Sequence, residues 1–436
     1  MKIYVKHIVM AVIATFVAGC QGLQMPQSPL LATFERKTGH IVYVGIDSNI
    51  YTMNQAGQDV VMITDQSVLE GKISDDTTYF YPAWSPNGEK LAFVGYRRGN
   101  DRSVEASLYT AKYDGKEFAR VFSEPGKQPF YVYWLPDSGD ISLLSGTTGD
   151  DRFVMDIVSV DGSGSQEISR GIPFYWAWAP DGDVLIAHKS SRPGAELGST
   201  SLSLVKVGDT VIDTSLDIRP SLFQSPAFSP DGKYFVAGIQ NSAGGGKLVL
   251  VEEPGDRRQI LDDIEGQAAF DWSPDGDRIA YMSGSPTVYG MVGELTLIDL
   301  ADIENPVVSD TNSSGVIAFF WDNSGEKIAY FSIGETGISD GVTQEFVLDL
   351  SVLDVDSGEV TSLITRLRPT DAFMTQIVPH FDQYQRSSTI WSPNDRYLVI
   401  NSMTEDNRPG IFVIDATGNL QPRLANYGVM PFWSRK

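Results

Sequence analysis

Residues 270–283 decide the fold, and they read Phe-Asp-Trp-Ser-Pro-Asp-Gly-Asp-Arg-Ile-Ala-Tyr-Met-Ser. An apolar run ends at Trp272, and Pro274 fixes the φ angle that a tight turn needs. The Asp-Gly pair that follows favours the same turn, and from Ile279 the chain resumes a β-type apolar run. The stretch therefore predicts a strand, a tight turn and a second strand.

The same pattern of an aromatic residue, a turn and an apolar strand recurs along nearly the whole chain. Its aromatic anchors are Trp84, Trp134, Trp178, Phe228, Trp272, Trp321, Trp391 and Trp433. Successive anchors lie 50, 44, 50, 44, 49, 70 and 42 residues apart, inside or near the period of a four-stranded propeller blade. Only the interval of 70 residues, which begins at Trp321, is overlong.

Each interval also holds two further β runs, so each repeat predicts four strands, A to D, with A ending at the aromatic anchor. No B to D strands follow Trp433, whereas the beginning of the chain has the runs 41–44, 50–53 and 60–63 without an A strand. We therefore predict an all-β, eight-bladed β-propeller of four-stranded blades. A composite blade, with its A strand from the C-terminus and its B to D strands from the N-terminus, would close the ring and remove exposed sheet edges.

The repeat resembles the TolB-like propeller repeat, a relative of WD-repeat blades, whose consensus is a Trp-Ser-Pro-Asp-Gly turn followed by an Ile-Ala-Phe-type strand. The resemblance covers roughly residues 39–436. It departs from the consensus at Phe228, which stands in place of Trp, and at Trp321 and Trp433, where the turn sequence has decayed. It implies a propeller and, by analogy with TolB-like proteins and propeller lipoproteins, an envelope scaffold, although such propellers serve many functions.

The N-terminus resembles a bacterial lipoprotein signal. Two lysines precede the apolar run 8–17, which has about the length of a signal-peptide core and is too short to span a bilayer. The run leads into Val-Ala-Gly-Cys, which resembles the lipobox, whose cysteine is diacylated and becomes the mature N-terminus. Because Cys20 is the single cysteine of the chain, we expect residues 1–19 to be a signal peptide and Cys20 the lipid attachment site. The alternative is an ordinary cleaved signal with an incidental cysteine.

The residues after the cysteine bear on localisation. Gln21 is not the aspartate that lipoproteins use for inner-membrane retention. We therefore expect a lipid anchor in the cell envelope, in the outer membrane facing the periplasm if the source is Gram-negative. Residues 20–38 are polar and proline-bearing and predict a flexible tether.

Residues 39–436 predict a single propeller domain, because no linker-like break divides them. No segment of convincing length shows apolar residues at the spacing of three to four positions that is typical of a helix. The formal net charge is −23, and it becomes −25 once residues 1–19 with their two lysines are removed. This charge argues against nucleic acid as a partner and against electrostatic docking on an anionic bilayer.

The predicted strand order places the A–B and C–D turns on one face of the ring and the B–C and D–A connections on the other. The first set is short, and the second includes the long connections 65–78, 96–104, 189–200, 333–343 and 366–388. Long loops on a rigid scaffold are where binding residues usually lie. We therefore expect the face of the B–C and D–A connections, here termed the binding face, to carry function.

Aromatic residues crowd the starts of the A strands on this face, for example Phe130, Tyr131, Tyr175 and Trp176. One interpretation is packing between blades, because aromatic residues in strands are ordinarily core residues. The other is a partly aromatic mouth of the central channel that suits a peptide or a sugar. On the second interpretation Tyr131 and Trp176 are candidate binding residues.

The overlong interval has a surplus of about 20 residues, mostly within 366–386. The candidate binding residues of this segment are Arg366, Arg368, His380, Asp382, Tyr384 and Arg386. Such a cluster could clamp a carboxylate or receive an acidic segment of a partner. The alternative is that Asp382 and Arg386 pair locally and pin the loop onto the ring.

Signals of catalysis are weak. Residues 337–341 match the Gly-x-Ser-x-Gly nucleophile elbow, but that motif needs a strand-to-helix turn and here falls in a B–C connection. A metal site needs convergent ligands, whereas His40, His188 and His380 belong to different predicted blades. We therefore predict no catalytic residue, no metal and no cofactor.

The sequence favours a non-enzymatic, lipid-anchored, monomeric envelope propeller that acts as a scaffold for a protein or peptide. The alternative is a carbohydrate-binding protein or carbohydrate-active enzyme that uses the aromatic mouth of the channel.

Overall fold

The computed structural model describes residues 24–25, 37–65, 77–99, 103–190, 200–240, 245–255, 257–287, 290–335 and 346–436. The predicted signal peptide, the predicted lipid attachment site Cys20 and the elbow-like stretch 337–341 lie outside the described residues.

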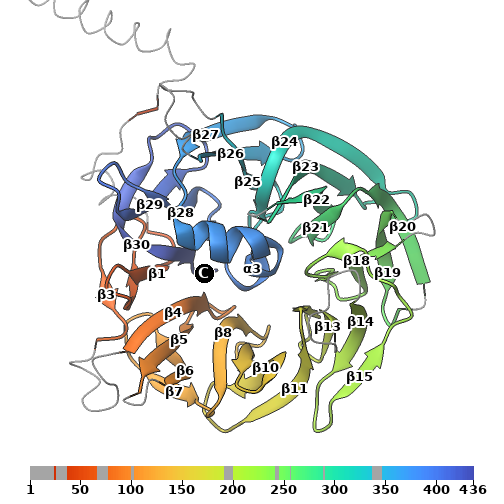
Figure 1. Cartoon of the computed structure of the whole chain (residues 1–436). Helices are drawn as coiled ribbons and strands as arrows, with labels where there is room; N and C mark the ends of the chain where they lie inside the picture. Colours follow the sequence, from red (N-terminus) through yellow and green to blue (C-terminus); the bar gives the residue numbers. More distant parts are fainter. Residues whose placement is uncertain are drawn as a thin grey trace, which may run out of the picture.

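Antiparallel sheets stand side by side around a central axis and form a disc (Figure 1). Four sheets have four strands each, in the order in which they follow one another along the chain. The first contains β4 (Thr77–Trp84), β5 (Lys90–Arg98), β6 (Val104–Lys112) and β7 (Ala119–Phe122). The second contains β8 (Lys127–Trp134), β9 (Asp140–Thr147), β10 (Asp150–Ser159) and β11 (Ser165–Gly171). The third contains β12 (Phe174–Trp178), β13 (Val184–Lys189), β14 (Ser201–Lys206) and β15 (Ile212–Ser215). The fourth contains β17 (Ala227–Phe228), β18 (Tyr234–Gln240), β19 (Gly246–Glu252) and β20 (Arg257–Ile264).

An eight-stranded sheet follows, and its long strand β24 belongs to two four-stranded units. Its strands are β16 (Leu222–Phe223), β21 (Gln267–Trp272), β22 (Arg278–Thr287), β23 (Gly290–Asp299), β24 (Val307–Trp321), β25 (Lys327–Ile333), β26 (Leu348–Asp354) and β27 (Val360–Leu367). The first part of β24 pairs with β23 between Val307 and Val316, and the second part pairs with β25 from Val316 to Trp321. β16 adds a short parallel pairing to β21.

A six-stranded sheet joins the two ends of the described chain. Its strands are β28 (Tyr397–Met403), β29 (Pro409–Asp415), β30 (Arg423–Trp433), β1 (Ile41–Gly45), β2 (Ile50–Met53) and β3 (Val61–Met62). The start of β30 pairs with β29, and its end pairs with β1, where Trp433 lies opposite Ile41. The prediction of an all-β chain built mostly from four-stranded antiparallel sheets is confirmed.

The repeated tryptophans join neighbouring sheets. Five indole Nε1–H groups each donate to the backbone carbonyl just before the aromatic anchor of the preceding repeat, at 3.0–3.4 Å. The pairs are Trp84 with Phe432, Trp134 with Ala83, Trp272 with Ala227, Trp321 with Asp271 and Trp391 with Phe320. Trp178 reaches the equivalent carbonyl of Tyr133 through the hydroxyl of Ser142. The repeat therefore specifies contacts between sheets as well as the turn within each sheet.

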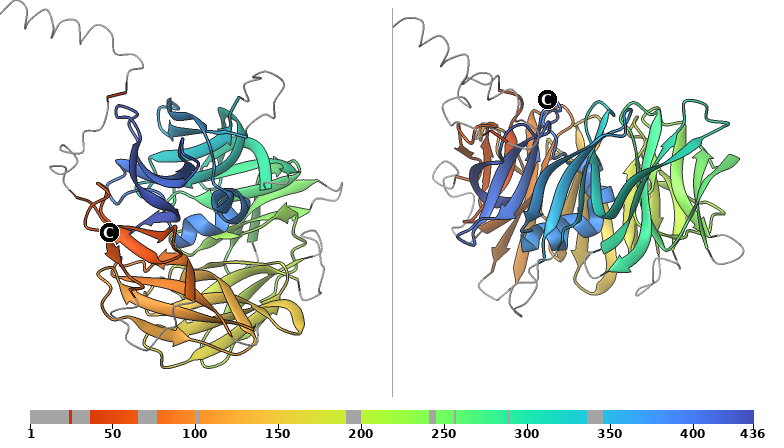
Figure 2. Two further views of the ribbon diagram at one scale, coloured as in Figure 1. Left: turned by 60° about the vertical axis from the view of Figure 1, so that its left-hand side comes forward. Right: turned by 90° about the horizontal axis from the view of Figure 1, so that it is seen from above.

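Helical structure occupies the centre of the ring, contrary to the sequence analysis. Residues 373–387, here termed the plug, form the π-helix η2 (Phe373–Ile377), the 3-10 helix η3 (Val378–His380) and the α-helix α3 (Phe381–Ser387). Figures 1 and 2 show α3 within the ring and within the thickness of the disc. The sequence analysis found no helix-period segment of convincing length, and these three helices are short. Apolar residues of the plug nevertheless recur at a helical spacing, and all are buried. They are Phe373, Met374, Ile377, Val378, Phe381 and Tyr384.

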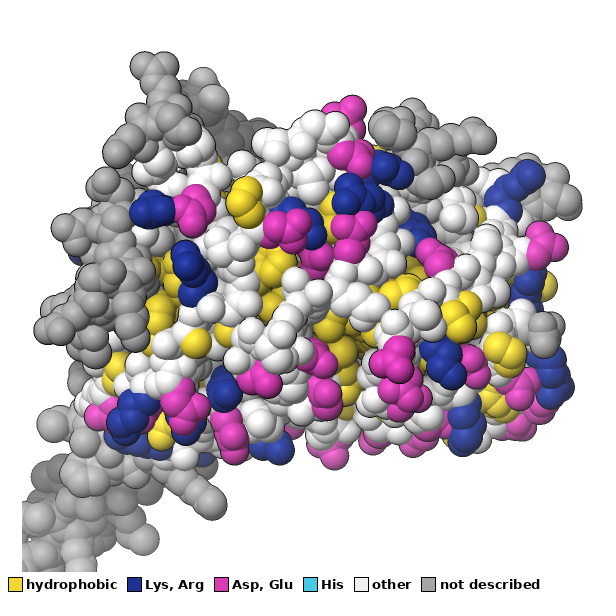
Figure 3. Space-filling view, turned by 90° about the horizontal axis from the view of Figure 1, so that it is seen from below, with side chains coloured by type: hydrophobic (Ala, Val, Ile, Leu, Met, Phe, Trp, Pro, Cys, Tyr) yellow, Lys and Arg dark blue, Asp and Glu magenta, His cyan; other side chains and the backbone are white. Residues whose placement is uncertain are grey.

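Charges on the outer side of the disc compensate one another locally. Figure 3 shows acidic and basic side chains interspersed over one side of the molecule. On β10, the side chain of Arg152 lies 2.8 Å from that of Asp150, and on β11 Arg170 lies 2.6 Å from Glu167. These pairs are partly exposed, and ion pairs in contact with solvent contribute little to stability. None of the helices in the described part of the chain combines the length and the apolar character that crossing a bilayer requires.

Candidate functional site

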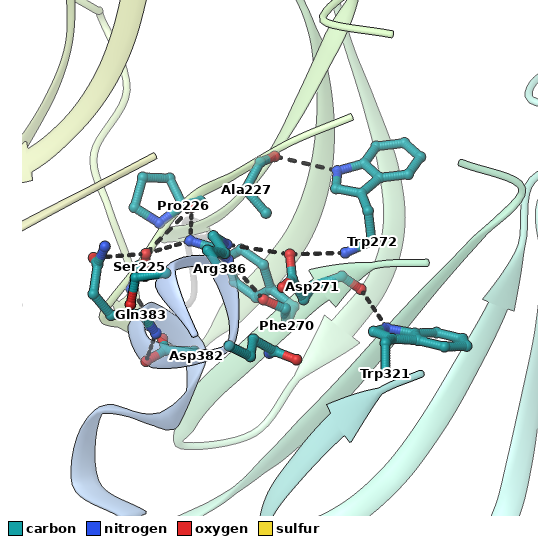
Figure 4. A network of polar contacts seen from close by, with 12 residues as sticks. Ser225, Pro226, Ala227, Phe270, Asp271, Trp272, Trp321, Asp382, Gln383 and Arg386 are labelled. Atoms are coloured by element: carbon teal, nitrogen blue, oxygen red, sulfur yellow. Dashed lines mark hydrogen bonds and ion pairs between the residues drawn. The ribbon is translucent and has the colours of Figure 1, made fainter. Parts of the chain in front are cut away.

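Arg386 of α3 is the main polar connection between the plug and the ring (Figure 4). Its Nε lies 3.2 Å from Oδ1 of Asp271, and the two side chains are only 9% and 14% exposed. Its guanidinium also donates to the Ser225 hydroxyl and to the carbonyls of Pro226 and Phe270. Each of the three guanidinium nitrogens therefore has an acceptor in the ring, which is the arrangement that a buried charge needs.

Two neighbouring residues of α3 bind backbone groups of the ring. The Ser225 backbone N–H donates to the Asp382 carboxylate at 3.0 Å. The Gln383 side chain accepts from the Trp176 N–H at 3.1 Å and donates to the Trp176 carbonyl at 2.9 Å, as an adjacent strand would. The sequence analysis offered an Asp382–Arg386 pair as one way to hold this segment on the ring. In the structure each of the two residues forms its own hydrogen bonds to the ring.

Burial changes the proton affinity of the acidic groups at this contact. Desolvation raises the pKa of Asp382 to about 6, although the nearby Arg386 charge acts in the opposite direction. Desolvation likewise raises the pKa of Asp271, again against the effect of Arg386. The Arg386 guanidinium therefore favours the ionised form of both carboxyl groups, Asp271 and Asp382, against the effect of their burial.

Aromatic packing completes the attachment of the plug. The Tyr384 ring meets Tyr131 of β8 edge-to-face at 5.2 Å and stacks on Phe432 of β30 at 6.3 Å. The Phe381 ring meets Phe319 of β24 at 5.2 Å. The Tyr131 hydroxyl donates to the Gln383 carbonyl at 3.0 Å. The aromatic residues at the starts of the A strands thus pack against the plug as well as between sheets.

A cavity of about 370 Å³ remains between the plug and the strands β8 and β12. It is here termed the aromatic cavity. Four of the predicted binding residues line it: Tyr131 and Trp176 from the ring, and His380 and Tyr384 from the plug. Half of the remaining lining residues are also aromatic. They are Tyr81, Phe130, Phe153, Phe174 and Tyr175. The predicted aromatic mouth and part of the predicted cluster of the overlong interval therefore form one site.

Three of the residues that line this cavity each hold one polar atom that is buried, with almost no accessible surface, and has no hydrogen-bond partner in the described structure. The three atoms are Nε1 of Trp176, Oε1 of Gln376 and Nδ1 of His380. Buried polar groups nearly always have a partner, so each exception needs an explanation. Burial also lowers the pKa of His380, which makes its imidazole neutral at pH 7. Gln376 was not predicted, because a single glutamine in a loop carries no distinctive sequence signal.

The three predicted arginines lie in separate places. Arg366 is exposed near the end of β27, where its guanidinium donates to the Glu335 carbonyl at 2.9 Å. Arg368 donates to the Thr404 carbonyl at 3.1 Å and to the Asn407 side chain at 2.7 Å. Arg386 lies inside the channel. Of the candidate binding residues predicted in the overlong interval, the structure therefore brings His380 and Tyr384 to the aromatic cavity and none of the three arginines.

The face of the A–B turns carries a second cavity, of about 440 Å³. In contrast to the aromatic cavity, charged groups line it, among them Asp271, Asp322, Arg386 and Arg435. Within the described ranges, no group of three or more His, Cys, Asp or Glu side chains is placed to hold a metal ion. His188 is enclosed in the ring, with Nδ1 2.8 Å from the Gln224 carbonyl.

Comparisons with known proteins address the fold. No protein-family model and no curated protein matches the chain. A prolyl endopeptidase structure is 12% identical with a TM-score of 0.51, and the match covers 80% of this chain and 49% of that chain. Together with the ring of antiparallel sheets, this match decides the architecture. The chain is a β-propeller.

Other solved structures similar to this propeller include two with lower TM-scores. The β-propeller domain of the Trilobed protease from Pyrococcus furiosus is 13% identical with a TM-score of 0.49, over 81% of this chain and 98% of that chain. TolB from Acinetobacter baumannii is 15% identical with a TM-score of 0.37, over 78% of this chain and 81% of that chain. The prediction of a β-propeller is confirmed, and at these identities the comparisons show the fold alone.

Proposed function

We propose that this chain is a lipid-anchored, eight-bladed β-propeller of the cell envelope that binds a protein or peptide partner at the aromatic cavity. The eight blades would be the four separate sheets, two within the eight-stranded sheet and two within the six-stranded sheet. Support for a closed ring comes from the pairing of Ile41 with Trp433 and from the bond of the Trp84 indole to the Phe432 carbonyl. The composite blade would then join the two ends of the domain.

The observation that carries the proposal is the aromatic cavity between the plug and the ring, whose lining combines many aromatic residues with a few polar ones such as Thr375 and Gln376. Ligand sites are typically concave, mostly apolar and equipped with a few polar groups that orient the ligand. The plug fills the channel yet leaves this volume open, and Gln383 of the plug fixes the backbone of Trp176 in the ring. A wall held in this way loses little conformational freedom when a ligand binds.

The composition of the cavity favours binding over catalysis. Among the described residues that line it there is no Asp or Glu. Hydrolysis of a glycosidic bond generally uses two carboxyl groups that flank the scissile bond. A carbohydrate-binding protein is a second candidate function, because aromatic walls also accept sugar rings, and it predicts binding of the same cavity to a neutral oligosaccharide.

The lipid anchor is supported by the sequence around Cys20. Anchoring is tested with Cys20→Ala, which should abolish incorporation of radiolabelled palmitate and move the protein from the membrane fraction to the soluble fraction. Retention of both label and membrane association would contradict the proposed anchor.

Partner binding is tested by photo-crosslinking in intact cells, with p-benzoylphenylalanine in place of Thr375, an exposed residue at the aromatic cavity. The matched control carries the crosslinker in place of Glu326, which is exposed in an A–B turn. We expect a discrete protein adduct from position 375 that is absent from position 326. Equal adducts from both positions, or none from position 375, would contradict a partner at this face.

A further inference from the structure

The cavity of about 440 Å³ on the face of the A–B turns is here termed the charged cavity. We propose that it binds the carboxylate of a ligand whose remaining part is apolar or aromatic. The α-helix α3 borders both cavities of the channel, but the charged cavity and the aromatic cavity share no described lining residue. The inference is therefore independent of the proposed function.

Arg435 places a cation without a carboxylate partner in the wall of the charged cavity. Its Nη2 donates to the carbonyls of Gln385 and Arg386, at 3.4 and 2.8 Å, in the last turn of α3. Its Nε and Nη1 have no hydrogen-bond partner among the described residues, and both keep accessible surface because the side chain is only partly buried. An arginine carries five N–H donors, so the bonds to α3 leave donors free for a ligand.

The other charged residues in the wall do not neutralise Arg435. Asp271 and Arg386 form an ion pair with each other at 3.2 Å. Asp322 is enclosed, and its carboxylate accepts from the Gly325 N–H at 2.8 Å within its own turn. One unit of positive charge therefore remains without a partner in the wall. A buried charge is stable when an opposite charge accompanies it, so the cavity suits a single negative charge such as a carboxylate.

The Tyr133 hydroxyl supplies a second donor for the same anion. Tyr133 lines the charged cavity, is partly exposed, and its hydroxyl has no hydrogen-bond partner among the described residues. Burial raises the pKa of Tyr133, while the charges of Arg386 and Arg435 act on it in the opposite direction. At neutral pH the phenol keeps its proton and can donate it to a carboxylate oxygen. A hydrogen bond to an ionised group is stronger than one between neutral groups.

The rest of the wall consists mainly of residues of the repeat. The aromatic anchors and turn prolines that line the cavity are Trp134, Trp178, Phe228, Trp272, Trp321, Pro86, Pro136, Pro230 and Pro274. The indole N–H groups of these four tryptophans already donate to acceptors in the ring, so the rings offer apolar surface to a ligand. The volume lies within the range of ligand sites and leaves room for an apolar group beside the carboxylate.

Two sources supply this chemistry. One is a small aromatic or aliphatic acid, and the other is the C-terminal residue of a polypeptide with an apolar side chain. Both present one carboxylate next to an apolar group.

The proposal is tested by NMR on the full chain labelled with ¹⁵N at the tryptophan indoles. Trp272 lines the charged cavity, and the variant Trp272→Phe lacks one indole signal and thereby assigns it. The probe is 3-phenylpropionate, and 3-phenylpropionamide is its uncharged counterpart. We expect the Trp272 signal to shift with saturation on addition of the acid, and the amide to require at least about 10-fold higher concentrations, because it lacks the charge that meets Arg435.

Three variants separate binding from folding. Arg435→Met should weaken binding of the acid at least about 10-fold, but it also removes the bonds to α3. Tyr133→Phe removes a hydroxyl that has no protein partner, so it should leave the melting temperature nearly unchanged while weakening binding about 2- to 10-fold. Arg257→Met, which removes an exposed arginine of β20, is the matched control and should leave binding unchanged.

The two sources are distinguished with an N-acetylated tetrapeptide, Gly-Gly-Gly-Phe, that has a free carboxyl terminus. Binding of this peptide at least as tight as that of 3-phenylpropionate would support a chain end as the ligand. Binding of the small acid alone would support a small molecule. Three results would overturn the inference: equal affinities for the acid and the amide, equal affinities of the wild type and both Arg435→Met and Tyr133→Phe, or displacement of the acid by inorganic phosphate at an equal concentration.

Discussion

Replacement of Arg386 by Met should loosen the plug and destabilise the ring beneath it. The substitution keeps an unbranched side chain and removes the guanidinium that lies 3.2 Å from Asp271 and that also serves three further acceptors. Loss of one partner of a buried ion pair typically costs about 3–5 kcal/mol of unfolding free energy, because the other charge remains buried and uncompensated.

The loss of unfolding free energy caused by Arg386→Met should be larger at high pH than at low pH. Burial already holds the pKa of Asp271 above its ordinary value, and Arg386 is the main influence that lowers it. Without Arg386 this pKa rises further, so the folded variant takes up a proton at a pH where the unfolded chain does not. The stability of the variant should therefore fall as pH rises from about 4 through the raised pKa, and the cost should be larger at pH 8 than at pH 5.

Urea unfolding followed by tryptophan fluorescence, with hydrogen exchange of the backbone amides of 381–387, measures both effects. Arg366→Met is the matched control, since it removes an exposed arginine of the same interval and should change stability by less than about 0.5 kcal/mol. The double variant Asp271→Asn with Arg386→Met should recover part of the loss, because the Asp271 carboxylate is then no longer left buried without its guanidinium partner. A cost below about 1 kcal/mol at pH 8, or a cost that grows on acidification, would refute the reasoning.

Two further predictions concern the ring. Trp84→Phe removes the hydrogen bond from its indole to the Phe432 carbonyl, whereas the buried Nε1 of Trp433 has no partner among the described residues. Trp84→Phe should therefore lower the free energy of unfolding by about 1–3 kcal/mol more than Trp433→Phe does. Equal losses of stability in thermal unfolding would contradict this role of the indole. Burial lowers the pKa of His188 to about 4, so the unfolded chain binds more protons below about pH 6.5 and stability should fall as pH drops from about 6.5 to 4. His188→Gln should flatten this part of the stability profile, and an unchanged slope would show that other groups cause it.

The repeat made most of the fold predictable. Trp272 and its equivalents end a strand, donate across to the preceding sheet and precede a turn that Pro and Gly favour, so local and long-range preferences agree. The runs 41–44 and 50–53 correspond to β1 and β2 with little change at their ends. The pairing of Trp433 with Ile41 follows from the same count of strands.

The plug was not predictable in the same way, because it occurs once and shares no pattern with the repeat. Its apolar residues follow a helical spacing from Phe373 to Tyr384, but η2, η3 and α3 are each short. Short helices depend on tertiary packing, which the sequence does not display. The role of Arg386 was missed for a related reason, since its partner Asp271 lies 115 positions earlier in the chain.

The most direct test of the account is the crystal structure of the protein with N-acetyl-phenylalaninamide, a minimal peptide unit, bound. We expect density for the probe between the plug and the strands β8 and β12, among the aromatic side chains that line that cavity. A plug displaced from the channel, or a probe that occupies the charged cavity beside Arg435, would contradict it.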